Sequence, residues 1–156
     1  MSAQLLALAE RLRLCRAVMV VDSDVRSLAP TVALLAPVAS WAAKNGIKKV
    51  FTLVADYGPG HDSEAQFKKT FTAAGGQIVG EVRVPVKNPD FAPFLQKIKD
   101  TKPDAVFLFL PPGAETIAFM KGFKERGLEQ AGIRLISTGD LPDEDILEAI
   151  GDSALG

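Results

Sequence analysis

Hydrophobic and polar positions follow two alternating patterns along most of this chain, from about residue 31 onward. Continuous apolar runs at 48–55 and 104–111 are typical of parallel strands that are covered on both faces. Runs at 77–86 and 133–139 also predict strands. The segments around these runs have apolar residues at helical spacing. They predict helices over 31–46, 62–76, 89–103, 113–128 and 141–152.

Residues that favour helix ends mark several of these boundaries. Asn45-Gly46 is a typical C-terminal cap for the first helix, and Pro37 marks either the start of that helix or a kink in it. Asp62 or Ser63 can cap the N-terminus of the next helix. The glycine-rich residues before this cap are therefore expected to form a loop.

Strands and helices that alternate at this spacing predict right-handed βαβ units and a mainly parallel sheet. We therefore expect an α/β fold, a three-layer Rossmann-like domain, over residues 31–156. Residues 1–30 are a separate N-terminal segment whose pattern fixes no element. Within it, Leu5, Leu8 and Leu12 have helical spacing, and "RAVMVVD" is either a short strand or an extension of that helix.

Composition and charge narrow the class of protein. The chain has 156 residues, the usual size of one domain, and its 47% hydrophobic and 24% charged residues are normal for a globular protein. A formal net charge of -1 gives no support for nucleic acid as a partner. Cys15 is the only cysteine, so the chain cannot form an internal disulfide.

Membrane and export patterns are not found in the sequence. Its longest apolar runs are far shorter than the roughly 20 residues that span a bilayer. The N-terminal apolar patch is interrupted by Glu10, Arg11 and Arg13, whereas a secretory signal has its positive charge before an apolar core. We therefore expect no export signal in the chain as written.

Four loops are expected at one edge of the sheet, because each of them follows a strand of a parallel series. They comprise residues 55–64, 87–91, 110–115 and 137–144. Ligands of open parallel sheets bind at the carboxyl ends of the strands. The first loop contains Gly58 and Gly60, but it matches neither GxGxxG nor the GKS or GKT of a phosphate loop, so a nucleotide site is not predicted.

Tyr57, His61 and Asp140 carry the clearest candidate chemistry in these loops. Tyr57, the only tyrosine, either packs on its own loop or presents its ring and hydroxyl to a ligand. His61, the only histidine, lacks the partners of a usual metal set, which favours a solvated or capping role. Asp140 either caps the helix that follows or contacts a ligand. No catalytic group, metal site or cofactor is predicted.

The order and spacing of five segments, over about 41–156, carry a family resemblance. The segments are "WAAKNGIKKVFTLVADYGPG", "FKKTFTAAGGQIVGEVRVP", "NPDFAPFLQKIKDTKPDAVFLFLPPG", "FMKGFKERGL" and "ISTGDLPDEDILEAIGDSALG". The chain resembles the type I periplasmic binding proteins, and among them the branched-chain amino acid (leucine/isoleucine/valine) receptors of ABC transporters. This resemblance implies two Rossmann-like lobes with the ligand in the cleft between them. The chain matches the second lobe only.

The resemblance also implies roles for individual residues. In the family an aromatic residue after the first strand of this lobe contacts the ligand, so the first wall of the site is assigned to Asp56, Tyr57 and Gly58. The loop after "DAVFLFL" supplies a second wall, and an acidic residue after the next strand pairs with the ammonium group of an amino acid. The corresponding residues here are Pro112, Gly113, Ala114, Gly139 and Asp140.

Taken together, these implications predict a non-enzymatic, periplasmic solute-binding component of an amino acid ABC transporter. Its expected partners are a small-molecule ligand, such as an amino acid, and the membrane subunits of the transporter, without nucleic acid. Because the chain ends after a helix, a sheet edge is expected to be uncovered, and a homodimer could cover it. Two alternatives stay open: a ligand-sensing regulatory lobe, and a stand-alone flavodoxin-like enzyme or nucleotide binder.

Overall fold

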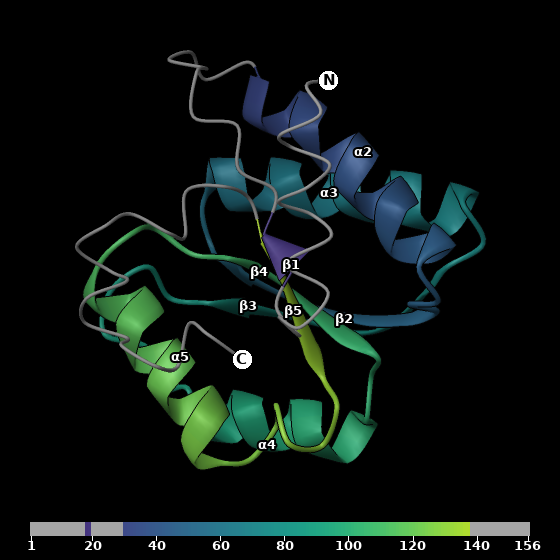
Figure 1. Cartoon of the computed structure of the whole chain (residues 1–156). Helices are drawn as coiled ribbons and strands as arrows, with labels where there is room; N and C mark the ends of the chain where they lie inside the picture. Colours follow the sequence, from purple (N-terminus) through teal and green to yellow (C-terminus); the bar gives the residue numbers. More distant parts are fainter. Residues whose placement is uncertain (1–17, 20–29, 138–156) are drawn as a thin grey trace, which may run out of the picture.

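The computed structural model describes residues 18–19 and 30–137, and within them five strands form a single sheet (Figure 1). The strands are β1 (Val18–Met19), β2 (Lys49–Ala55), β3 (Gln77–Val84), β4 (Ala105–Phe109) and β5 (Arg134–Ser137). Their order in the sheet is β1-β5-β4-β2-β3, and every neighbouring pair is parallel. β4 is therefore central, and β3 is an edge strand of the described sheet.

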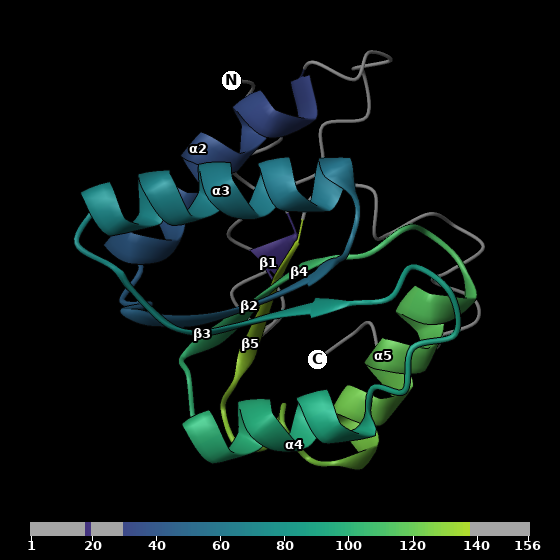
Figure 2. The same cartoon turned by 180° about the vertical axis from the view of Figure 1, so that it is seen from behind.

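The helices of the described residues cover both faces of this sheet. They are α2 (Pro30–Lys44), α3 (Gly58–Ala73), α4 (Ala92–Thr101) and α5 (Ala114–Glu125). α2 and α3 lie on one face, and α4 and α5 lie on the other, which gives three layers (Figures 1 and 2). All of β4, and all of β2 after its first residue, are buried, as their apolar runs predicted. The predicted α/β fold with a mainly parallel sheet is confirmed.

An apolar core fills the space between the sheet and each pair of helices. On the side of α2 and α3, the rings of Phe67 and Phe107 stack with their centroids 4.2 Å apart. On the side of α4 and α5, Phe91 and Phe119 meet edge-on at 5.5 Å. Tyr57 packs against both cores from its position just after β2. The two cores therefore meet at the end of β2.

The register of the strands brings their carboxyl ends to one edge of the sheet. Ala55, the last residue of β2, pairs with Val84, the last residue of β3. Phe109, the last residue of β4, pairs with Val54 of β2. The loops that follow β2, β3 and β4 therefore begin close together. We call this side of the sheet the carboxyl edge and the opposite side the amino edge.

At the amino edge, turns and one carboxylate connect the helices to the strands that follow them. Gly46 and Gly75 have φ angles of +82° and +89°, in the left-handed region that glycine adopts readily. The Asp104 carboxylate accepts hydrogen bonds from the backbone N–H groups of Lys48 and Lys49, both at 2.8 Å. Asp104 thereby joins the start of β4 to the start of β2.

The start of α3 differs from the prediction. The helix begins at Gly58 rather than at residue 62, and Pro59 lies in its first turn. Proline is favoured there, because its missing N–H group would have no helical partner in the first turn. Tyr57 occupies the N-cap position, and the prediction that Asp62 or Ser63 caps the helix is wrong.

Three further expectations concern the ends of the chain and of α2. Pro37 lies inside α2, so the helix begins before it. Val18–Met19 pair in parallel with β5, which confirms the strand interpretation of "RAVMVVD" over these two residues. The predicted helix at 141–152 and Cys15 lie outside the described residues. Within the described ranges, no helix combines the length and the apolar character needed to cross a membrane.

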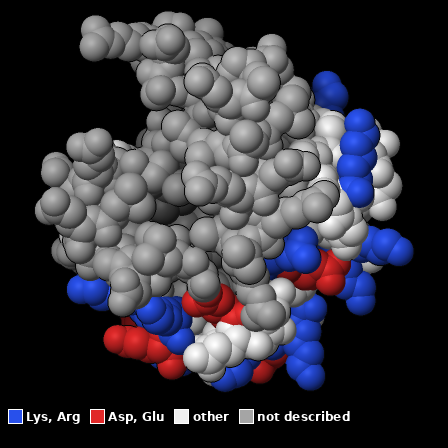
Figure 3. Space-filling view, viewed as in Figure 1, with Lys and Arg blue, Asp and Glu red and all other residues white. Residues whose placement is uncertain are grey.

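Charged side chains of both signs are mixed on the face of the described residues that Figure 3 shows. In Figure 3, Lys and Arg lie among Asp and Glu over the lower part of the view. This mixture agrees with the formal net charge of -1. It differs from the single-sign basic face that is typical of nucleic-acid-binding domains.

Candidate functional site

Backbone hydrogen bonds fix the candidate residues that follow β2. The Asp56 N–H donates to the Val84 carbonyl at 2.8 Å, so the pairing of β2 with β3 continues past the end of β2. The Tyr57 N–H donates to the Ala55 carbonyl at 2.9 Å, and the Tyr57 backbone is extended. Tyr57 therefore has a defined position at the carboxyl edge, where the sequence predicted it.

The Tyr57 ring is partly buried and packs on the end of β4. Its centroid lies 6.2 Å from that of Phe109, with 33° between the ring planes. Aromatic pairs at this separation stabilise each other beyond the effect of the area that they bury. The ring thus packs within the fold, as one interpretation predicted, and keeps exposed surface at the carboxyl edge. Its contact with a ligand stays a prediction.

The first turn of α3 approaches the end of β2 very closely. A Cβ atom at Gly60 would lie 2.1 Å from the carbonyl oxygen of Ala55, so no side chain fits there without a backbone shift. At Gly58, in contrast, no atom lies within 4 Å of an added Cβ. The two glycines therefore differ in role. Gly60 permits the packing of α3, whereas Gly58 is exposed at the first position of the helix.

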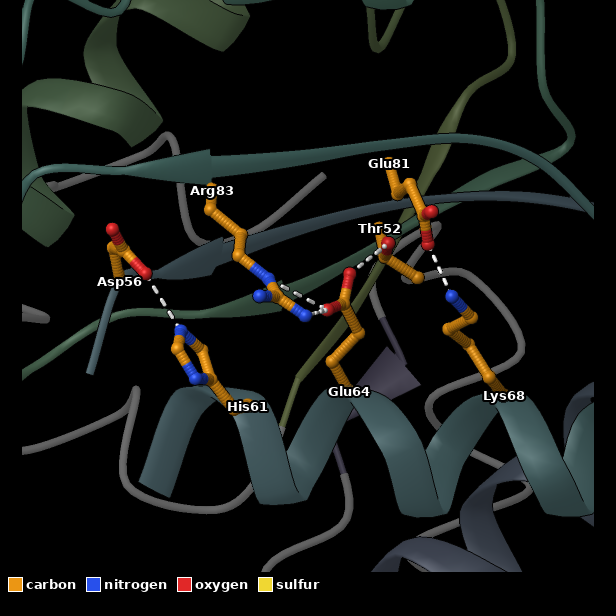
Figure 4. Close-up of polar contacts among 7 residues, drawn as sticks. All are labelled: Thr52, Asp56, His61, Glu64, Lys68, Glu81 and Arg83. Carbon is orange, nitrogen blue, oxygen red and sulfur yellow. Dashed lines mark hydrogen bonds and ion pairs between the residues drawn. The ribbon is translucent and has the colours of Figure 1, made fainter. Parts of the chain in front are cut away.

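His61 and Asp56 form a polar pair across the start of α3 (Figure 4). The distance from His61 Nε2 to Asp56 Oδ1 is 2.6 Å. The side chains of His61 and Asp56 are 40% and 59% exposed. His61 is thus solvated, as predicted, and it also has a carboxylate partner that the sequence did not reveal.

The loop after β4 begins beside the loop after β2, because these strands are neighbours. Gly113 precedes α5 with φ +134° and ψ -151°, a conformation that is essentially limited to glycine. The Thr116 hydroxyl donates to the Pro111 carbonyl at 2.8 Å and ties the first turn of α5 to this loop. Pro112 and Ala114 are exposed. The structure therefore brings the first two predicted walls of the site to the same edge.

The third predicted group of site residues, Gly139 and Asp140, lies outside the described residues. β5 ends at Ser137 and runs parallel to β4, so it leads toward the carboxyl edge. A contact between Asp140 and a ligand stays a prediction.

A polar network between α3, β2 and β3 was missed by the sequence analysis (Figure 4). Glu64 of α3 is 2% exposed. Its carboxylate accepts hydrogen bonds from the Thr52 hydroxyl at 2.8 Å and from Arg83 at 3.0 and 3.2 Å. Lys68 and Glu81 form a second, more exposed ion pair between α3 and β3. The available signal was Thr52, a polar residue inside an otherwise apolar strand.

The groups at the carboxyl edge differ from those of a metal site. Among the described residues, no group of three or more His, Cys, Asp or Glu side chains is placed to hold a metal ion. The edge offers instead the Tyr57 ring and the N-termini of α3 and α5. A helix N-terminus favours a negative group, because its first N–H groups lack helical partners and its dipole is positive there.

Comparison with known proteins agrees with this geometry. The family model described as "Periplasmic binding protein" matches residues 24–156. The chain belongs to the periplasmic binding protein family. The resemblance drawn from its sequence is therefore confirmed.

Relatives of this periplasmic binding protein differ in their named or bound solutes. The Leu/Ile/Val-binding protein homolog 6 of Brucella melitensis biotype 1 is 48% identical over 120 residues, which cover 77% of this chain and 31% of that protein. A solute binding protein of an ABC transporter from Rhodopseudomonas palustris BisB5, solved in complex with 3,4-dihydroxy benzoic acid, is 56% identical. Its TM-score is 0.76, and the match covers 81% of this chain and 34% of that one.

A second solute binding protein from R. palustris was solved in complex with 4-hydroxybenzoate. It is 47% identical with a TM-score of 0.75, and the match covers 79% of this chain and 33% of that one. This periplasmic binding protein chain thus spans about one third of the length of the relatives that it matches.

Proposed function

We propose that this chain forms one wall of the ligand site of a solute-binding protein that serves an ABC transporter, and that it binds its solute without changing it chemically. The observation that carries the proposal is the carboxyl edge, where Tyr57 and the N-terminus of α5 follow neighbouring parallel strands. An aromatic ring beside a helix N-terminus suits a ligand with an apolar body and a carboxylate. The relatives solved as solute-binding proteins of ABC transporters support this role.

As the class of ligand, the proposal favours aromatic acids of the hydroxybenzoate type. Its support is the identity of 56% and 47% to two proteins solved with 3,4-dihydroxy benzoic acid and 4-hydroxybenzoate. A benzoate ring can stack on Tyr57 or meet it edge-on. The carboxylate can accept hydrogen bonds from the first N–H groups of α5.

Branched-chain amino acids are the second candidate class, favoured by the name of the Brucella relative that is 48% identical. An amino acid also carries an ammonium group, which needs a carboxylate partner once water is removed. Among the described residues of the first loop, the Asp56 carboxylate is already engaged by His61 at 2.6 Å. We therefore rank this class second.

An NMR titration tests the proposal directly, because Tyr57 is the only tyrosine of the chain. With isotope-labelled tyrosine, every ring signal reports on Tyr57. The titrants are 4-hydroxybenzoate, 3,4-dihydroxybenzoate, leucine, isoleucine and valine, with 4-hydroxybenzyl alcohol as a matched control that lacks the carboxylate. We expect the two benzoates to shift the Tyr57 signals, the alcohol to shift them less, and the indole signal of Trp41 on α2 to stay unchanged.

Affinity is expected to be low, because one wall makes only part of the contacts of an enclosed site. If each wall supplies about half of the ~8 kcal/mol of a micromolar receptor, the dissociation constant is roughly 1 mM or weaker. Tighter binding of an amino acid than of either benzoate would reverse the ranking of ligand classes. No change in Tyr57 with any titrant at tens of millimolar would contradict the proposed site. A micromolar constant would show a complete site in this chain.

The proposal extends to partners, location and assembly. Membrane subunits of an ABC transporter are the proposed protein partners, and the periplasm is the proposed location, both supported by family membership. A homodimer is also proposed, because β3 has no further strand beside it among the described residues. Light scattering that shows a monomer at high protein concentration would contradict the homodimer.

A further inference from the structure

The proposed ligand site does not use the buried carboxylate of Glu64. This side chain lies in α3 and is 2% exposed. One of its oxygens accepts a hydrogen bond from the Thr52 hydroxyl at 2.8 Å, and the other accepts two from Arg83, from Nε at 3.2 Å and Nη2 at 3.0 Å. A buried charge is tolerated only when it is paired and hydrogen-bonded, and both oxygens of Glu64 meet that condition.

The partners of Glu64 connect it to the start of the segment 56–64, which we call the ligand loop. Arg83 and Val84 are consecutive residues of the edge strand β3. The Arg83 guanidinium binds Glu64, while the Val84 carbonyl accepts the hydrogen bond of the Asp56 N–H at 2.8 Å. The end of β3 therefore holds both ends of the segment 56–64, and this segment contains Tyr57.

Contacts inside the same segment make it stiff. The Asp56 and His61 side chains are 2.6 Å apart, from Oδ1 to Nε2. The backbone N–H of His61 donates to the Tyr57 carbonyl at 3.0 Å. Gly60 packs directly on the carbonyl of Ala55. Figure 4 shows Asp56, His61, Glu64 and Arg83 in a row along the space between α3 and β3. Displacement of one of these groups would therefore be passed on to the backbone that carries Tyr57.

Attachment of the edge strand alone does not explain this arrangement. Lys68 and Glu81 also join α3 to β3, and Lys68 lies four positions after Glu64 in the helix. The side chains of Lys68 and Glu81 are 36% and 56% exposed. That exposed pair ties the same two elements without burying a charge. What distinguishes the pair of Glu64 and Arg83 is the burial of the Glu64 carboxylate, while Arg83 is 51% exposed, and the place of the pair beside the ligand loop.

The geometry points to Glu64 and Arg83 as positioning residues, which act through the backbone to hold Tyr57 in its place at the carboxyl edge. The planar guanidinium and the carboxylate fix both distance and direction, which a single point charge would not do. A loop that is fixed before the ligand arrives loses less conformational freedom on binding. This inference rests on the proposed function, because it assigns Tyr57 to the ligand site.

Two variants of this chain test the inference without any ligand. Arg83→Met keeps the apolar stem of a half-exposed side chain and removes the guanidinium. The double variant Glu64→Gln/Arg83→Met also removes the buried charge, so it tolerates the loss of the cation better. Tyr57 and His61 are the only tyrosine and the only histidine, so labelled tyrosine and histidine report on the ligand loop alone.

The matched control is Lys68→Met, which breaks the other ion pair between the same helix and the same strand. We expect both Arg83 variants to shift and broaden the ring signals of Tyr57 and His61, while Lys68→Met leaves them unchanged. Arg83→Lys restores a cation without the planar fork, and we expect it to restore the wild-type signals only in part.

A purely structural role predicts a different result. If the variants lower the melting temperature while the Tyr57 and His61 signals stay at their wild-type positions, the positioning role is wrong. Equal signal changes in Lys68→Met would also overturn it, because attachment of β3 alone would then suffice. These measurements need no ligand, so failure of the proposed ligand class leaves their outcome unaffected.

Discussion

Two pairs of glycines, Gly46 and Gly75 at the amino edge and Gly60 and Gly113 at the carboxyl edge, serve different physical purposes. At the amino edge, Gly46 and Gly75 have positive φ angles, and no atom lies within 4 Å of a Cβ added to either of them. They reverse the chain and leave open space. At the carboxyl edge, a Cβ on Gly60 would meet a backbone carbonyl at 2.1 Å, and Gly113 adopts φ +134°. Glycine there permits close approach and an unusual backbone.

These glycines differ in how well they tolerate substitution. Gly46 and Gly75 need particular backbone angles, and residues other than glycine can adopt them at moderate cost, whereas their neighbour Gly76 lies against the Phe71 ring and leaves no room for a Cβ. Gly60 needs the absence of a side chain, and Gly113 needs an angle that only glycine reaches. Substitutions that look alike in sequence should therefore differ in their effect on the free energy of unfolding.

The largest effect is expected for Gly60→Ala. Alanine would gain about 1 kcal/mol of helix propensity over glycine in a helix interior. The clash with the Ala55 carbonyl outweighs this gain, because overpacking costs about 1–3 kcal/mol and a backbone atom at 2.1 Å places this site at the upper end. We expect a net loss of about 2 kcal/mol in a urea titration.

Gly58→Ala is the matched control in the same turn, where an added Cβ meets nothing within 4 Å. We expect its stability to stay within about 1 kcal/mol of the wild type. Equal stability of the two alanine variants would show that α3 does not need its close approach to β2.

A second effect, of about 1–2 kcal/mol, is expected for Gly113→Asn, because φ +134° and ψ -151° lie outside the left-handed helical region that asparagine tolerates. The matched change at the amino edge is Gly46→Asn, at φ +82°. Asparagine also occurs at this helix-terminal position, so we expect a loss of about 1 kcal/mol or less. Thermal unfolding of both variants checks the order, and a reversed order would refute the distinction between the edges.

The smallest effect is expected at the amino edge for Asp104→Ala. This change removes the acceptor of the Lys48 and Lys49 N–H groups, and the exposed site lets water replace it. We expect a loss of about 1 kcal/mol. Asp104→Asn keeps an acceptor oxygen and should lose less than half of that. An unchanged melting temperature for the alanine variant would mean that the backbone bonds of β2, β4 and β5 hold this edge alone.

The strands were predictable from the sequence because burial on both faces leaves a plain pattern. The run at 48–55 became β2 (Lys49–Ala55), and the run at 104–111 became β4 (Ala105–Phe109). Their carboxyl ends then followed from the parallel topology, so Tyr57 and Gly113 were expected at one edge. The pairing order β1-β5-β4-β2-β3 did not follow, because local periodicity carries no information on which strands become neighbours.

The start of α3 was not predictable from the cap rules alone. Asp62 and Ser63 are favourable N-cap residues, but Pro59 is also favourable in a first turn, and the packing of Gly60 on Ala55 decides between them. The pair of Glu64 and Arg83 lies 19 positions apart in sequence, so only the tertiary fold brings it together. Within this network, only Thr52 is recognisable in the sequence, as a polar residue inside an apolar strand.

Tyr57 packs against both apolar cores, one on each face of the sheet. Substitutions in either helical layer can therefore shift the Tyr57 ring, even where the substituted residue makes no contact with a ligand. During evolution, the position of the Tyr57 ring can therefore change through substitutions in either of two separate cores. Under the proposed function, the core residues of both helical layers therefore influence solute preference together with the residues at the surface of the site.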